Sequence, residues 1–260
     1  MKLVVTEKND AAQKIADLLG VKKPKADKVY STPVYRFDVD GEEWVTIGLR
    51  GHILEPDFTP TMVYKKRGGW QGVTEEGETF PAQLPATLPK PPFKKKKPFT
   101  EDGVELKTWK MDALPYLVYA PIKKLPKEKE IIRSLKNLAK KADSVIIATD
   151  FDREGELIGS DALSCIQEVN PDAPVQRARY SAFTKEEITH AFDNLVELDV
   201  NLASAGASRQ DIDLIWGAVL TRYLTLVKFA GYGNVRSSGR VQTPTLALIV
   251  AKERERLAFV

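Results

Sequence analysis

The chain has 260 residues, and 39 lysines and arginines against 36 aspartates and glutamates leave a formal net charge of only +3. This length provides for one large domain or two small ones, and 43% hydrophobic with 29% charged residues excludes a disordered or fibrous protein. A single cysteine, Cys165, excludes an internal disulfide and a Cys-x-x-Cys zinc site. No apolar run approaches the roughly 18 residues of a membrane span, so we expect a cytoplasmic protein without membrane contact.

Strand and helix patterns alternate from the first residues onward. The apolar run 2–6 predicts a buried strand, and apolar residues at helical spacing over 11–19 predict a helix that ends at a glycine. Two alternating strands over 34–49 flank Asp40 and Gly41, a dipeptide typical of a two-residue hairpin.

The alternation continues in the second half of the chain. We expect a helix over 127–142, a strand over 144–149 with a helix directly after it, a strand over 175–181, and a helix that begins with a capping box from Thr184 to Glu187. This order predicts an α/β fold in which helices flank a mostly parallel sheet. From Asn201 the pattern is helical to the end apart from a break at 231–239, which predicts a second, helical domain.

Residues 58–126 lack clean periodicity and are rich in proline and lysine. This composition predicts an irregular insertion, with short edge strands as an option. The insertion contains Lys94 to Lys97, flanked by Phe93 and Phe99. Such a run is either a solvated loop or an arm that touches nucleic acid.

An acidic turn follows the strand at 144–149. Asp150, Asp152 and Glu154 are spaced Asp-x-Asp-x-Glu, at the strand end where ligands bind in parallel sheets. Their mutual repulsion leaves two interpretations. Either the carboxylates are solvated and cap the next helix, or a divalent cation such as Mg²⁺ compensates them.

A further carboxylate comes directly after the first strand. Glu7 and Lys8 follow residues 2–6, and two strand ends of one sheet can converge on a common site. Lys8 is a cation suited to a phosphate oxygen. The alternative is an ordinary, solvated helix start.

Five segments of the chain match a known family in order: VTEKNDAAQKIA, ATDFDREGELIG, RYSAFTKEEI, SRQDIDLIWG and SSGRVQTPTLALIVAKERE. They resemble the N-terminal motifs of type IA DNA topoisomerases, and in detail those of the topoisomerase III and archaeal enzymes. The first two resemble the signature of the Toprim domain, a metal-binding α/β module. The resemblance implies a Toprim domain over 1–190, with the insertion at about 58–126, and part of the helical domain over 191–260.

The resemblance also implies roles for individual residues. Glu7 matches a glutamate that transfers a proton at the scissile phosphate and contacts the metal, and Lys8 matches a lysine near that phosphate. Arg240 matches the stretch that lines the single-strand path, and it is expected to act with Lys8 as a catalytic positive group. Asp150, Asp152 and Glu154 match the carboxylates that hold Mg²⁺. The DNA-binding positions are Arg179, Arg209, Asp213, Gln242, Thr243 and His52, the last of which is alternatively a strand-end histidine bonded to backbone.

None of the eight tyrosines stands in a setting like the Tyr-x-Arg-Thr-Asp of the family's nucleophile. The resemblance therefore implies the N-terminal portion of a nucleoid-associated isomerase, with the remainder of the topoisomerase chain as its partner. It would bind Mg²⁺ and single-stranded segments of negatively supercoiled DNA, and support tyrosine-mediated cleavage and religation in relaxation and decatenation. Two alternatives are a self-contained Toprim nuclease or primase, and a non-catalytic single-strand-binding module.

Overall fold

The computed structural model describes residues 1–228 and 234–259. Its contacts divide the chain into two compact units. The first unit comprises Met1–Glu55 with Leu125–Ser208, and the second comprises Pro56–Lys124 with Arg209–Val260.

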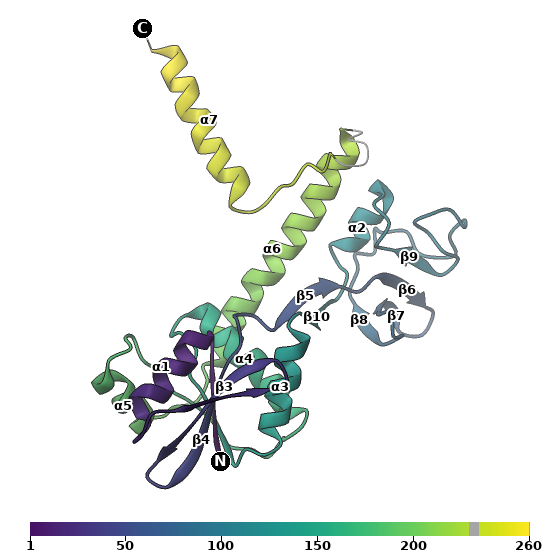
Figure 1. Ribbon diagram of the computed structural model, residues 1–260. Coiled ribbons are helices and arrows are strands. Elements are labelled where there is room, and N and C mark those ends of the chain that lie inside the picture. Colours follow the sequence, from purple (N-terminus) through teal and green to yellow (C-terminus); the bar gives the residue numbers. More distant parts are fainter. Residues whose placement is uncertain (229–233, 260) are drawn as a thin grey trace. The chain divides into compact units, whose positions relative to one another are not determined.

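The first unit is built on a six-stranded sheet of order β12-β11-β1-β4-β3-β2. Figure 1 shows β3 and β4 of this sheet with helices on both sides. Strands β12, β11, β1 and β4 are parallel, whereas β3 and β2 run antiparallel at one edge. The strands are β1 (Lys2–Thr6), β2 (Lys25–Val29), β3 (Thr32–Val39), β4 (Glu42–Gly48), β11 (Ser144–Ile147) and β12 (Val175–Arg177).

Helices cover both faces of this sheet. On one face α3 (Lys129–Ala139) and α4 (Arg153–Gln167) pack over Leu3 and Val5 of β1. On the other face α1 (Asn9–Leu19) and α5 (Lys185–Asp193) pack over Val4. Because successive strand residues point to opposite faces and both faces are buried, Leu3, Val4 and Val5 of β1 are all apolar instead of alternating with polar residues.

These elements confirm the expected α/β class, with its mostly parallel sheet and flanking helices. The hairpin at Asp40 and Gly41 is also confirmed, since both residues have positive φ angles, 52° and 83°. At the expected capping box, the Thr184 hydroxyl accepts a hydrogen bond from the Glu187 amide at 3.3 Å. Strand β2 was not expected, because its sequence KADKV is mostly polar; it lies exposed at the edge of the sheet, beside β3.

The second unit contains a four-stranded antiparallel sheet of order β8-β7-β6-β9. Met62, Trp70 and Tyr116 belong to a buried core beneath it. The segment 58–126 therefore holds a small folded sheet, which differs from the irregular insertion that its composition predicts. The elements are β6 (Thr61–Lys65), β7 (Gly69–Val73), β8 (Thr79–Ala82), β9 (Gly103–Glu105), a 3₁₀ turn (Met111–Ala113) and α2 (Leu114–Leu117); β5 (Leu54–Phe58) pairs separately with β10 (Ile122–Pro126).

The four lysines from Lys94 to Lys97 are exposed. The rings of Phe93 and Phe99 pack against each other with 4.7 Å between centroids, and both contact the core of the second unit. The run is therefore a solvated loop anchored by two aromatic side chains, and whether it touches nucleic acid stays a prediction.

Two long helices end the chain, α6 (Val200–Val227) and α7 (Gln242–Ala258). The break expected at 231–239 is present over 234–239, which are not helical, while 231–233 lie outside the described residues. None of the helices in the described part of the chain is both long and apolar enough to span a membrane.

Candidate active site at the strand ends of the first unit

Three neighbouring parallel strands, β4, β1 and β11, deliver the polar residues of the site to one edge of the sheet. Glu7 follows β1, and the acidic turn follows β11. The loop after β4 is fixed to the end of β1, because the Leu49 amide donates to Thr6 O at 3.0 Å and the Gly51 amide donates to Glu7 O at 2.9 Å. Arg50 and Gly51 have φ angles of 62° and 86°, and this left-handed turn leads the chain to His52.

Lys8 joins the first strand end to the second. Its Nζ lies 3.0 Å from Glu7 Oε1 and 3.7 Å from Asp150 Oδ2. The hydrogen bond to Glu7, together with the charges of Glu7 and Asp150, raises the pKa of Lys8 above its ordinary value. Lys8 is therefore a cation at neutral pH, and it faces two carboxylates from adjacent strands.

The acidic turn also starts α4. Asp152 is the N-cap of this helix, and its Oδ1 accepts a hydrogen bond from the Gly155 amide at 2.7 Å. A Cβ on Gly155 would lie 2.0 Å from Asp150 O, so the turn closes only with glycine there. Glu154 Oε2 lies 3.1 Å from His52 Nε2. The structure therefore places the His52 ring in contact with a carboxylate of the acidic turn. The alternative left open by the sequence was a histidine at a strand end that bonds only to backbone.

A buried ion pair beneath the turn was missed by the sequence reasoning. Arg177 Nε donates to Glu156 Oε2 at 2.6 Å, and both side chains are fully buried. The same guanidinium donates through Nη2 to Asp150 O at 2.9 Å, while Glu156 Oε1 accepts from the Asp199 amide at 3.0 Å. Arg177 therefore holds the backbone of Asp150 in place. Other charged residues stand nearby, Arg179 after Arg177 and Glu154 before Glu156, so no local pattern marked this pair.

Arg179 and Tyr180 come shortly after Arg177 in the sequence. The Arg179 guanidinium lies over the Phe151 ring at 4.9 Å and 3.9 Å from Glu156 Oε1. The Tyr180 hydroxyl donates to Ala148 O at 2.7 Å, and burial, with the charge of Asp150 as a smaller cause, raises its pKa strongly. Tyr180 is therefore a neutral structural group and not an activated nucleophile.

The carboxylates at this edge of the sheet could supply some of the ligands of a divalent cation. Among the described residues, no three His, Cys, Asp or Glu side chains form a group able to hold a metal ion. Asp152 caps α4 and Glu154 contacts His52. Glu7 and Asp150, however, both contact one ammonium group, so their oxygens face a common point that accommodates positive charge. Two carboxylates with water fit the oxygen ligand set of Mg²⁺.

The second unit holds the other predicted residues around one carboxylate. Arg240 donates to Asp213 through Nε at 2.5 Å and through Nη2 at 3.3 Å, and Arg209 Nε lies 3.9 Å from Asp213 on the same helix. The hydrogen bond from Arg240 lowers the pKa of Asp213. Asp213 therefore orients two arginines.

Gln242 and Thr243 lie at the start of α7. The Thr243 hydroxyl is 3.0 Å from the Ser238 hydroxyl, and the Ser238 amide donates to Thr221 Oγ1 of α6 at 3.0 Å. These bonds attach the loop that carries Arg240 to α6.

Comparison with known proteins identifies this arrangement. Residues 2–183 match the Toprim domain family, and residues 197–260 match the DNA topoisomerase family. DNA topoisomerase 1 of Archaeoglobus fulgidus is 39% identical over 257 residues, which are 97% of this chain and 31% of that protein. DNA topoisomerase 1 of Thermoplasma acidophilum is 34% identical over 99% of this chain, and human DNA topoisomerase 3-alpha is 30% identical over 99%.

The fold has a solved counterpart in full-length topoisomerase I from Thermotoga maritima, with a TM-score of 0.54 and 22% identity over 99% of this chain and 31% of that one. The chain spans about a third of the length of the archaeal relatives. Toprim domains bind divalent metal ions, which agrees with carboxylates at adjacent strand ends. The chain belongs to the type IA DNA topoisomerases, as an N-terminal portion that carries the Toprim domain.

Proposed function

We propose that this chain is the part of a type IA topoisomerase that holds the scissile phosphate of one DNA strand while a tyrosine from a further part of the protein cleaves and rejoins it. The observation that carries the proposal is the meeting of Glu7, Lys8 and Asp150 at the ends of adjacent strands. A phosphodiester needs a cation beside its oxygens and an acid beside its leaving oxygen, and this strand edge offers both kinds of group.

Lys8 supplies the fixed positive charge. Its raised pKa keeps it protonated, and its side chain is 65% exposed, so a phosphate oxygen can reach it. The Glu7 side chain is only 14% exposed and lies beside Lys8. Once it has taken up a proton, its carboxyl group gives that proton to the departing 3′ oxygen and takes it back on religation.

Mg²⁺ is the cation we propose for this edge. Glu7 and Asp150 would hold it in place of the Lys8 ammonium, which would turn to the phosphate. Asp152 and Glu154 would complete the site by turning from Gly155 and His52. When bound, the ion offsets the negative charge of the phosphate. Arg177 keeps the acidic turn in position through Asp150 O, and His52 limits the orientations of Glu154.

The arginines of the second unit are proposed to bind the sugar-phosphate backbone of single-stranded DNA. Arg209 and Arg240 converge on Asp213, and the Arg240 side chain, which is 39% exposed, is oriented so that a phosphate can reach it. Gln242 and Thr243 supply neutral donors at the adjacent helix start, and Arg179 would contact the strand near the acidic turn. These contacts read phosphates rather than base edges, so we expect weak sequence preference.

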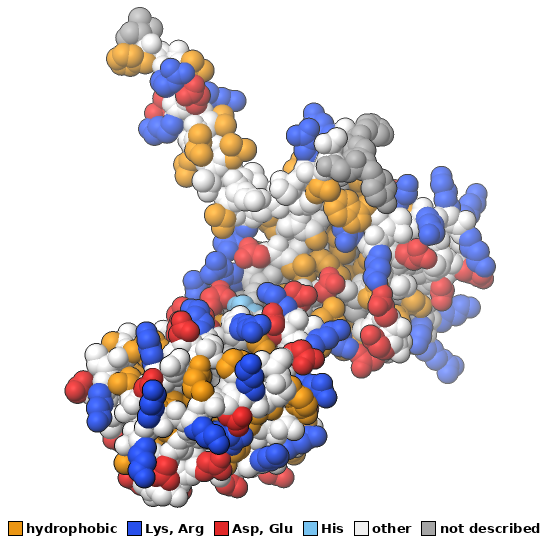
Figure 2. Space-filling model, viewed as in Figure 1, with side chains coloured by type: hydrophobic (Ala, Val, Ile, Leu, Met, Phe, Trp, Pro, Cys, Tyr) orange, Lys and Arg blue, Asp and Glu red, His pale blue; other side chains and the backbone are white. Residues whose placement is uncertain are grey.

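Exposed apolar side chains support a protein partner for the second unit. Figure 2 shows hydrophobic side chains gathered on α6 beside α2, and Ile212 and Trp216 of α6 are 51% and 48% exposed. On α7, Leu248 is 70% exposed. Such faces are typical of protein contacts, and we propose that the remainder of the topoisomerase covers them. Relaxation of negative supercoils and decatenation, at the nucleoid, belong to that whole enzyme.

Two measurements test the proposal. First, this chain incubated with end-labelled single-stranded DNA and Mg²⁺ should give neither a covalent adduct nor free cleaved DNA on a denaturing gel. Cleaved DNA that disappears with Asp150→Asn would instead favour the Toprim nuclease.

Second, this chain should restore plasmid relaxation when it replaces the matching third of the Archaeoglobus fulgidus enzyme. Lys8→Gln in that chimera should abolish relaxation, whereas Lys22→Gln, an exposed lysine of the same unit, should not. A folded chimera that binds DNA but relaxes none would contradict the proposed function.

A further inference from the structure

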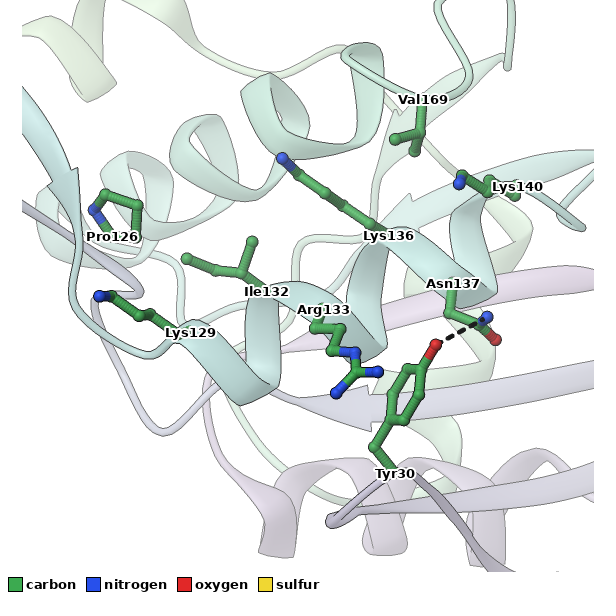
Figure 3. Close-up of a pocket in the computed structure, with 9 residues that line it drawn as sticks. All are labelled: Tyr30, Pro126, Lys129, Ile132, Arg133, Lys136, Asn137, Lys140 and Val169. Carbon is green, nitrogen blue, oxygen red and sulfur yellow. Dashed lines mark hydrogen bonds between the residues drawn. The ribbon is translucent and has the colours of Figure 1, made fainter. Parts of the chain in front are cut away.

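The outer face of α3 carries a row of cations outside the strand-end site. Lys129, Arg133, Lys136 and Lys140 follow at intervals of four, three and four residues, about one per turn, so they share one face of the helix. Leu135 and Leu138 on the opposite face are fully buried against the sheet. Figure 3 shows the row along α3.

A cavity of about 400 Å³ adjoins this row, between α3 and the turn that joins β2 to β3. Tyr30, at the turn, is 49% exposed and has a left-handed backbone with φ 51°. The Arg133 guanidinium lies 4.0 Å from the centre of its ring, and its hydroxyl accepts a hydrogen bond from Asn137 Nδ2 at 3.5 Å (Figure 3). An aromatic ring held by a cation and an amide is thus presented beside the row.

The charges of this face are poorly compensated within the chain. Lys136 pairs with Glu168 at 2.6 Å. In the described part of the chain, no ion pair is recorded for Lys129, Arg133 or Lys140. An ordinary solvated helix face alternates charge signs at these spacings, because like charges three or four residues apart destabilise the helix. Here Lys129 and Arg133, and again Lys136 and Lys140, are like-charged neighbours, so an external polyanion would relieve their repulsion.

We propose that this face, defined by Tyr30, by Lys129, Arg133 and Lys136 of α3 and by Lys140 directly after it, binds a single-stranded segment of DNA away from the strand-end site. Each turn of helix advances 5.4 Å and offers one cation to the phosphates of one strand. The cavity and the half-exposed ring of Tyr30 accept an unpaired base, which a duplex does not offer. No carboxylate lines the cavity, so this contact needs no divalent cation. The choice of DNA rests on the proposed function.

Salt dependence of binding tests the cation row. Fluorescence anisotropy of a labelled (dT)₂₀ strand is measured in EDTA over a range of salt for the chain, for Arg133→Gln with Lys140→Gln, and for a control pair, Lys22→Gln with Lys23→Gln. Both pairs remove two exposed positive charges from the first unit. Each phosphate contact to a single strand contributes a slope of about 0.7 in log K against log salt. The α3 pair should therefore lower the slope by about 1.4 and the affinity by about 25-fold at 0.1 M salt, and the control pair should change neither.

Photocrosslinking tests the base contact. A strand that contains 5-iododeoxyuridine should crosslink to the peptide that holds Tyr30, and Tyr30→Leu should remove this crosslink and weaken binding at least about fivefold. Equal slopes for both variant pairs, absence of the crosslink at residue 30, or tighter binding of a duplex of equal length would each overturn the proposal. If the α3 variants bind normally while the chimera relaxes plasmid DNA, only this inference fails. If the unmodified chain binds no single-stranded DNA, the proposed function fails as well.

Discussion

Arg177 and Glu156 form an ion pair that is closed to solvent, with 2.6 Å between Arg177 Nε and Glu156 Oε2 and no exposed surface on either side chain. Further hydrogen bonds bring the guanidinium to Asp150 O and the carboxylate to the Asp199 amide. The pair therefore links β12, α4 and the start of α6 to the acidic turn. Burial removes both charges from water, and this cost is offset only because nearly every donor of the guanidinium and acceptor of the carboxylate forms a hydrogen bond.

We predict that Arg177→Met lowers the free energy of unfolding by about 3–5 kcal/mol, because it leaves the Glu156 carboxylate buried and unpaired. Arg177→Met combined with Glu156→Leu should recover much of that loss. Urea unfolding followed by circular dichroism measures both. Arg179→Met removes a cation of the same segment that is 35% exposed, and should cost less than about 1 kcal/mol. Equal losses for the two arginine variants would contradict the assigned role of the buried pair.

Asp152 is the N-cap of α4 and a proposed Mg²⁺ ligand, and these two roles can be separated. Asp152→Ala should lower the free energy of unfolding by about 1 kcal/mol, because the Gly155 amide loses its acceptor, whereas asparagine caps a helix as well as aspartate does. Both variants should weaken Mg²⁺ binding in calorimetry, since both remove the charge. Asp150→Asn should weaken Mg²⁺ binding with no loss of the cap. Unchanged Mg²⁺ binding by Asp152→Asn would leave Asp152 as a cap alone.

Tyr180 should make the fold sensitive to alkaline pH. Burial raises the pKa of its hydroxyl, so above about pH 10 the unfolded chain loses this proton while the folded chain keeps it. Stability is therefore fully present below pH 10 and falls above it by up to about 1.4 kcal/mol per pH unit.

The comparison with Tyr180→Phe isolates this effect, since the other titrating groups are the same in both proteins. The difference in unfolding free energy between the two should shrink between pH 9 and pH 11. A constant difference over that interval would show that the hydroxyl ionises alike in the folded and unfolded chains.

Arg240 should bind DNA without regard to sequence. Arg240→Gln should weaken binding of unrelated single strands alike and lower the salt slope by about 0.7, because one phosphate contact is lost. The matched control is Arg254→Gln on α7, an exposed arginine of the same unit. A loss confined to one sequence would point to base reading.

Local patterns were sufficient for much of the fold. The hairpin at Asp40 and Gly41 and the cap at Thr184 were predictable because a turn or a helix start is decided by residues within four positions of one another. The small sheet of the second unit was not, since its core is made of scattered aromatic residues such as Trp70 and Tyr116 instead of regular apolar runs.

By itself, the sequence determined the order of strands and helices in the first unit, apart from β2, and which strand ends carry carboxylates. Only the tertiary structure decided which of those carboxylates share a partner. Glu7 and Asp150 meet at Lys8 because β1 and β11 are neighbours, and Glu154 meets His52 across 102 positions of sequence. Strand neighbours and the pairing of buried charges depend on contacts between distant segments. The spacing of apolar residues, two in a strand and 3.6 in a helix, shows only which face of its own strand or helix a side chain occupies.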